Sequence, residues 1–238
     1  SMILFGSYKI IPLFSSMALL AVTYLFTTSL TKSRFAGLVS MGILLQSHIF
    51  LTYDTSSTYT TFWILFYVLS LYAVVKFWFT NPVLYFASLF SKPLTALFSP
   101  MSIFFILNSH IPKKQKIILS AVIFAIIIAG GSMMLSSGDI QEEPRWDEFW
   151  TGFTSFAFQM RFDFIIILFL LPLIFGLFIV SKNNKYANSI SILIVGILLA
   201  APLLTGITDK TNMPYRFIPI SVFFAVGVGI LFSKTTKV

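Results

Sequence analysis

The sequence contains no cysteine and only two histidines among its 238 residues. Without cysteine, the chain can form no disulfide, no thiolate metal site and no cysteine nucleophile. The two histidines, His48 and His110, are too few for a histidine-rich metal centre. The Walker, HExxH, GxSxG and CxxC motifs are also absent, so the common signatures of nucleotide, zinc and serine-hydrolase chemistry are missing.

Charged residues are scarce as well. They make up 10% of the chain, whereas 57% of the residues are hydrophobic and 28 are phenylalanine. A typical soluble domain carries about 25% charged residues. We therefore predict an all-α polytopic membrane protein that forms a single transmembrane domain over residues 1–238. In such a protein the net charge of +8 indicates basic cytoplasmic loops and lipid partners, with no nucleic-acid partner.

Long apolar runs predict the membrane helices. The clear spans are 10–30, 35–53, 61–79, 117–135, 164–180, 190–204 and 217–232. One further apolar segment, 83–108, contains Lys92 and Pro93 near its centre. A lysine at mid-bilayer costs roughly 2.5 kcal/mol or more, and a proline breaks or kinks a helix. This segment therefore does not fit a single membrane helix.

The distribution of charge resolves this conflict. The basic segments that contain no acidic residue are 32–34, 113–116, 182–185 and 234–237. The positive-inside rule places them in the cytoplasm, and Lys76 ends its helix on the same side. An even number of crossings must then separate Lys76 from Lys113. We predict that 83–108 is a hairpin of two short helices with Lys92 at its outer turn, near the interface or in a water-filled cavity.

This arrangement gives about nine crossings, with the C-terminus in the cytoplasm and the N-terminus outside. An outside N-terminus without a signal sequence is natural for a chain preceded by a further helix and an external loop. Two alternatives therefore stay open: such a segment precedes Ser1, or the chain has none. The cysteine-free, lysine-rich and isoleucine-rich composition indicates a prokaryotic plasma membrane.

Basic residues on the outer side could bind a phosphate group. Lys92 lies at the hairpin turn, and Arg216 lies at the mouth of the last helix in "MPYRFIPI". Arginine binds phosphate through paired hydrogen bonds, and lysine binds it as a point charge. The alternatives are a lysine that extends to the interface and an arginine that anchors a helix end beside Tyr215. If both bind one phosphate, their side chains share one outer cavity. A third basic residue, Arg161, could instead pair with Asp163 where the next helix begins.

All eight acidic residues lie in three stretches predicted to be external, which are 54–59, 139–163 and Asp209. The segment 136–163 is acidic and aromatic, and we expect an external loop with an interfacial helix. Asp147 and Glu148 in it, and Asp54 in the loop after the second span, could bind a divalent cation such as Mg²⁺ or Mn²⁺. One of them could act as a general base. The alternatives are a solvated loop and, for Asp54, a helix cap.

Three stretches in this order resemble a known family. They are "IIPLFSSMALLAVTYLFTTSLTKSRFAGLVSMGILLQSHIFLTYDTSSTYTTFWILFYVLSLYAVV", "YFASLFSKPLTALFSPMSIFFIL" and "MPYRFIPI". They are similar to the membrane region of GT-C superfamily glycosyltransferases, which include protein mannosyltransferases and oligosaccharyltransferase catalytic subunits. The resemblance implies a polyprenyl-phosphate sugar donor on the outer face, with its phosphate held by Lys92, Arg216 and, more weakly, Arg161. It also implies an external carboxylate that acts as base or metal ligand. The family's key acid lies after its first helix, in a loop that this chain does not contain.

Three functions therefore stay open. The first is a GT-C-like membrane glycosyltransferase, whose catalytic acid is not identified in this chain. The second is a non-catalytic subunit of a larger membrane complex, with an aromatic surface buried against partner subunits and no cavity near Lys92. The third is a small lipid or anion transporter, with a pathway open to both sides of the membrane.

Overall fold

The computed structural model describes residues 9–53, 60–136, 163–207 and 218–233, and all regular structure within these ranges is helical. The predicted all-α class is therefore confirmed. Nine helices in these ranges have ten or more residues: α2 (Ile10–Thr31), α3 (Arg34–Gln46), α5 (Thr60–Lys76), α6 (Asn81–Ser91), α7 (Ser99–Asn108), α8 (Lys113–Ser136), α10 (Phe164–Val180), α11 (Lys185–Ile207) and α12 (Ile218–Leu231). The short elements are α4 (His48–Tyr53) and the 3₁₀ helices η1 (Trp78–Thr80) and η2 (Pro93–Phe98).

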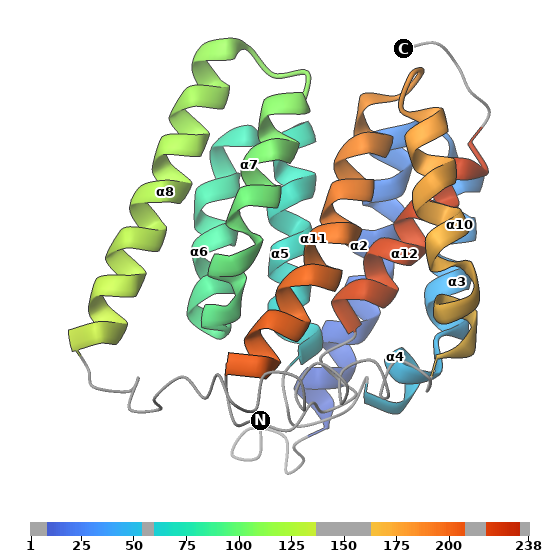
Figure 1. Ribbon diagram of the computed structural model, residues 1–238, viewed down its shortest axis with the longest axis horizontal. Helices are drawn as coiled ribbons and strands as arrows, with labels where there is room; N and C mark the ends of the chain where they lie inside the picture. Colours follow the sequence, from blue (N-terminus) through green and yellow to red (C-terminus); the bar gives the residue numbers. More distant parts are fainter. Residues whose placement is uncertain (1–8, 54–59, 137–162, 208–217, 234–238) are drawn as a thin grey trace.

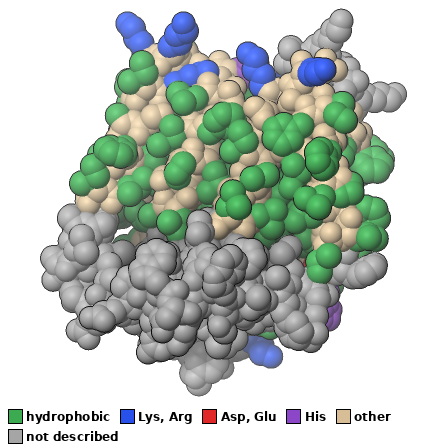
Figure 2. Space-filling view, viewed as in Figure 1, with side chains coloured by type: hydrophobic (Ala, Val, Ile, Leu, Met, Phe, Trp, Pro, Cys, Tyr) green, Lys and Arg blue, Asp and Glu red, His purple; other side chains and the backbone are tan. Residues whose placement is uncertain are grey.

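Successive long helices run in opposite directions, so the turns between them gather at two ends of the bundle (Figure 1). One end, which we call the lysine end, carries the basic segments 32–34, 113–116 and 182–185 together with Lys76. The opposite end carries the turn between α6 and η2, and we call it the hairpin end. Figure 2 shows lysine and arginine side chains gathered at the lysine end, above a body covered with hydrophobic side chains.

Helix α12 lies inside the bundle, is buried along nearly its whole length and packs against α3, α11, α10 and α2. Small residues make these approaches possible. A Cβ added to Gly229 would lie 2.6 Å from the carbonyl oxygen of Ala36 on α3 and even closer to the hydroxyl of Ser40. A Cβ added to Gly37 would lie 2.8 Å from the carbonyl oxygen of Tyr24 on α2. The backbones of α2, α3 and α12 therefore touch where glycine permits it.

The helix predicted over 35–53 is interrupted, and that prediction was wrong in this respect. Helix α3 ends at Gln46, and Ser47 adopts an extended backbone conformation. The Ser47 backbone N–H donates to the carbonyl oxygen of Leu44 at 3.2 Å, and its hydroxyl accepts from the backbone N–H of Phe50 at 3.3 Å. One serine thus closes α3 and opens α4, because its side chain replaces a backbone hydrogen bond at the break.

The segment 83–108 is a helical hairpin, as its charge pattern predicted. Helix α6 ends at Ser91, and Pro93 is the first residue of η2, which leads directly into α7. Lys92 between them has φ −154° and ψ 111°. This extended conformation is the one that a following proline favours, since its ring disfavours helical geometry in the preceding residue. The Lys-Pro pair therefore sets the turn.

Helix α2 is, within the described ranges, the one helix long and apolar enough to cross a bilayer by length and composition. Six further apolar segments of 10–17 residues are Arg34–Gln46, Thr60–Lys76, Thr95–Asn108, Ile165–Val180, Lys185–Leu199 and Ile218–Leu231. Large apolar side chains also point outward from the bundle. Phe90 is 84% exposed, Phe175 68% and Ile179 71%. The face of the bundle seen in Figure 2 is therefore largely apolar below the lysine end.

The tight contact at Gly229 gives a test of the packing. We expect Gly229→Ala to lower the free energy of unfolding by about 1–3 kcal/mol, because the added methyl group meets the backbone of α3. Gly42→Ala is the matched control, since nothing lies within 4 Å of a Cβ added there. It should raise stability by about 0.5–1 kcal/mol through helix propensity. Chemical unfolding of the detergent-solubilised chain measures both, and equal effects would contradict the packing described.

Candidate functional site

Lys92 is the predicted phosphate ligand that the structure describes, and it lies at the hairpin end. Its side chain is half-buried, and its ammonium lies 5.7 Å from the centre of the Trp63 ring. This geometry is a cation–π contact, which contributes about 0.5–2 kcal/mol and fixes the position of the charge. The sequence analysis predicted that Lys92 is an interfacial lysine or a phosphate ligand. It did not predict the contact with the Trp63 ring.

Trp63 lies on α5 and is held in place by contacts with η2 and α6. The residue is 2% exposed, and its ring stacks on Phe98 of η2 with centroids 5.7 Å apart and an interplanar angle of 21°. Its carbonyl oxygen accepts the hydroxyl of Ser88 on α6 at 3.1 Å. The indole Nε1 is buried and has no hydrogen-bond partner in the part of the chain that the structure describes. A buried donor without a partner costs about 1–3 kcal/mol, and an acceptor bound there would recover it.

Hydroxyl groups tie the two arms of the hairpin together below Lys92. Thr95 on η2 exchanges a 3.1 Å hydroxyl contact with Ser88 on α6, and its carbonyl oxygen accepts the hydroxyl of Tyr85 at 3.1 Å. The backbone N–H of Thr95 donates to the carbonyl oxygen of Lys92 at 3.0 Å. These side chains are buried, so the bonds are shielded from water. The Lys92 backbone is therefore fixed on both sides of the turn.

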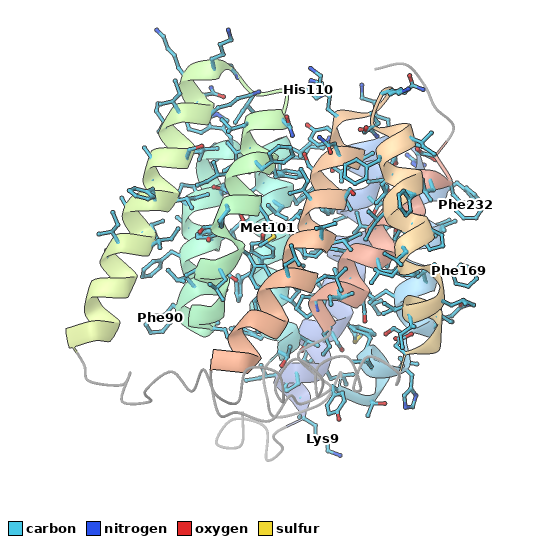
Figure 3. All side chains as sticks on the ribbon, viewed as in Figure 1. Lys9, Phe90, Met101, His110, Phe169 and Phe232 are labelled. Carbon is cyan, nitrogen blue, oxygen red and sulfur yellow. The ribbon has the colours of Figure 1, made fainter. Side chains whose placement is uncertain are left out.

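Apolar side chains continue from the Lys92 turn along the outside of α6. Phe86 and Phe90 stack on each other with centroids 6.3 Å apart, and both are exposed. Figure 3 labels Phe90 at the hairpin end, pointing away from the bundle. A cation at the end of a helix that exposes an aromatic pair suits a ligand with an anionic head and an apolar chain.

The other predicted site residues lie outside the described residues. They are Arg161, Arg216, Asp54, Asp147 and Glu148, and the predicted interfacial helix within 136–163 lies there too. The shared cavity of Lys92 and Arg216 therefore stays a prediction. In the described ranges, no group of three or more histidine or acidic residues is placed to hold a metal ion.

A buried carboxylate that the sequence analysis did not select as a site residue lies at the start of α10. Asp163 is 4% exposed and accepts a 2.6 Å hydrogen bond from the hydroxyl of Ser47. Its second oxygen accepts the backbone N–H of Ile166 at 3.4 Å, which caps α10. The hydroxyl of Ser221 on α12 lies 3.2 Å from that of Ser47. One carboxylate thus joins the break after α3, the start of α10 and the middle of the bundle.

Part of this cluster had a visible signal in the sequence. An aspartate directly before a long apolar run is typical of a helix N-cap, and Asp163 caps α10 in this way. Its bond to Ser47 spans 116 residues and follows from no local pattern. The partner predicted for Asp163, Arg161, is not among the described residues.

A cavity of about 10 Å³ adjoins the cluster, roughly the space of one water molecule.

No protein-family model matches the chain, and no curated protein or solved structure is significantly similar to it. The GT-C resemblance therefore rests on the residues quoted for it.

The bond between Asp163 and Ser47 can be measured directly. We expect Asp163→Ala to lower the free energy of unfolding by about 2–4 kcal/mol, because it removes a helix cap and leaves a buried hydroxyl without its acceptor. Ser47→Ala should cost about 1–3 kcal/mol, and the double variant should cost less than the sum.

Ser191→Ala is the control for this cycle. Ser191 is equally buried, but its hydroxyl has no partner among the described residues. Its replacement should be neutral or stabilising, because it removes a buried polar group that makes no bond. Strict additivity of the Asp163 and Ser47 variants would contradict the hydrogen bond.

Proposed function

We propose that this chain is the membrane-embedded part of a GT-C-like glycosyltransferase, and that its hairpin end holds the phosphate of a polyprenyl-phosphate-linked sugar. The observation that carries this proposal is the Lys92 turn. It presents a fixed ammonium on the face of Trp63, at the end of the bundle opposite the other lysine clusters. The resemblance of the Lys-Pro hairpin to that family supports it.

We propose further that the bundle crosses the bilayer about nine times, with the lysine end in the cytoplasm. Two features support this. The exposed faces of α2, α8 and α10 carry large apolar side chains, which a soluble monomer rarely exposes as one continuous belt. The basic turns lie together at one end, as the positive-inside rule requires. Several helices are shorter than about 20 residues, and local bilayer thinning accommodates short spans at modest cost.

The chemistry at the hairpin end follows from charge. When a sugar leaves a polyprenyl phosphate, negative charge develops on the phosphate oxygens. The Lys92 ammonium, held on the Trp63 ring, would stabilise that charge. The exposed Phe86–Phe90 pair would receive the first isoprene units of the lipid. Arg216 and Arg161 remain the further predicted phosphate ligands.

Transfer also needs an acid or base, and the candidates are Asp54, Asp147 and Glu148, alone or with Mg²⁺ or Mn²⁺. The family's own catalytic acid is not identified in this chain. A chain that binds the lipid without transferring sugar would be a non-catalytic subunit of a membrane complex. Binding and transfer are therefore separate questions, and the Lys92 site concerns binding.

The test is binding of a polyprenyl monophosphate to the chain in phosphatidylcholine nanodiscs. We expect Lys92→Met to weaken this binding about fivefold, since one cation near a membrane surface contributes about 1 kcal/mol toward an anionic lipid. Trp63→Phe should weaken it less than Lys92→Met does, because the variant keeps an aromatic ring beneath the ammonium. Native mass spectrometry of the lipid-bound chain measures both.

Lys9→Met is the matched control, because Lys9 lies at the same end of the bundle and is exposed (Figure 3). It removes the same charge without touching the turn, so its effect reports the general surface potential. Unchanged affinity in Lys92→Met, or an equal loss in Lys9→Met, would overturn the proposed site.

A further inference from the structure

The lysine end contains a cleft of about 810 Å³, opposite to the hairpin end. It opens between the end of α2, the start of α3, the end of α5 and the turn from α10 to α11. The basic side chains that line it are Lys32, Arg34, Lys76, Lys182 and Lys185. His110 lines it as well, and none of its lining residues is acidic.

The walls of this cleft are fixed by hydrogen bonds and ring packing. The side-chain amide of Asn184 donates to the carbonyl oxygen of Leu30 at 3.4 Å and accepts the backbone N–H of Tyr186 at 2.9 Å. Asn184 thereby ties the α10–α11 turn to the end of α2. The Tyr186 ring is buried between Phe105 at 5.6 Å and His110 at 5.4 Å. These contacts therefore hold in place the backbone segments that carry the cations of the cleft.

Lys32 occupies a backbone position that ordinarily favours glycine. It caps the C-terminus of α2 with φ 56° and ψ 19°, the left-handed conformation. Within the described residues it is the one non-glycine residue with a positive φ. A side chain in this region costs about 1–2 kcal/mol, and helices ending this way usually carry glycine. Lys32 adopts this unfavourable backbone conformation at the mouth of a cationic cleft. We infer that its charge has a role there.

Like charges at this end act on one another. Burial and then the neighbouring Lys185 and Lys113 lower the pKa of Lys116. Lys116 and Lys185 both line a smaller adjoining cavity of about 240 Å³, and the Lys116 ammonium donates to the carbonyl oxygen of Leu107 at 2.6 Å. A cleft lined by one sign of charge concentrates the field and attracts a counter-ion. Negative charge in the cleft would relieve this repulsion.

The positive-inside rule explains why cations lie at this end, but it does not explain why five of them surround one cleft. Lys113 and Lys114 obey the same rule, are exposed and do not line it. Leu25, Leu30 and Val75 also line the cleft, together with Thr28, Ser29 and Tyr72. Cations and apolar side chains in one cleft fit an amphiphile with an anionic head.

We propose that the lysine-end cleft binds a phosphate group with two or more negative charges, presented either by an anionic lipid or by a free polyphosphate. Lys182, Lys185, Lys32, Arg34 and Lys76 neutralise the phosphate oxygens. Leu25, Leu30 and Val75 receive an acyl chain when the source is a lipid. This site is separate from Lys92, so either can fail without the other.

The experiment compares two double variants of the full chain. Lys182→Gln/Lys185→Gln removes two charges from the cleft, and Lys113→Gln/Lys114→Gln removes two charges from the same end outside it. Titration with phosphatidic acid in phosphatidylcholine nanodiscs, read by native mass spectrometry, gives the affinities. We expect the cleft variant to bind about thirtyfold more weakly, and the control to change much less.

A second arm separates the two sources of phosphate. Inorganic pyrophosphate is titrated by calorimetry into the detergent-solubilised chain without anionic lipid. Binding that the cleft variant loses assigns a soluble polyphosphate. Lipid binding without pyrophosphate binding assigns a lipid headgroup. An equal loss in both double variants, or no binding of either probe to the native chain, overturns the proposal.

Lys32→Gly separates binding from folding. It removes a cleft charge but places glycine in the left-handed position, so the midpoint of thermal unfolding should rise while the phosphate affinity falls several-fold. Lys182→Arg/Lys185→Arg keeps both charges and should retain binding. An unchanged affinity in Lys32→Gly, measured on a chain with a raised midpoint, would contradict the role given to Lys32.

Discussion

The confinement of charge to the ends of the helices is the constraint on which the rest of the structure depends. Every charged residue in the described ranges lies at a helix terminus or in a turn. Between the ends, several hydroxyl side chains bond to a carbonyl oxygen of their own helix. The hydroxyl of Thr23 donates to the carbonyl oxygen of Leu19 at 2.7 Å, and that of Ser40 donates to Ala36 at 3.1 Å. Hydroxyls that bond within their own helix, together with glycines, allow close helix packing without charged side chains in the interior.

The two ends of the bundle are built differently. At the hairpin end, the Lys92 ammonium rests on a buried indole, and the exposed Phe86 and Phe90 lie on the preceding helix. At the lysine end, five cations surround an open cleft that Leu25, Leu30 and Val75 also line. The first arrangement suits one phosphate at a fixed place, whereas the second suits a more highly charged group. The proposed lipid-linked donor and the proposed cytoplasmic-side anion therefore belong to opposite ends, separated by the length of the helices.

Local patterns predicted much of the fold. Apolar runs located the helices within a few residues, and the charge pattern resolved 83–108 into a hairpin, because proline and lysine act on the backbone next to them. The break at Ser47 escaped prediction, since no apolar or charge pattern marks the place where this serine replaces a backbone hydrogen bond. The basic cleft escaped too. Its cations come from three segments far apart in the sequence, and tertiary packing, including that of Asn184 and Tyr186, brings them around one space.

The orientation of the bundle is the central claim, and the absence of cysteine makes it directly measurable. Ser91→Cys places one thiol at the exposed hairpin turn, and Lys114→Cys places one at the exposed lysine end. Each single-cysteine chain is treated with a membrane-impermeant maleimide, in intact cells and again after permeabilisation. The proposed topology predicts that Ser91→Cys is labelled in intact cells and that Lys114→Cys is labelled only after permeabilisation. Labelling of both from the same side would contradict a bundle that crosses the bilayer, and the reversed result would contradict its orientation.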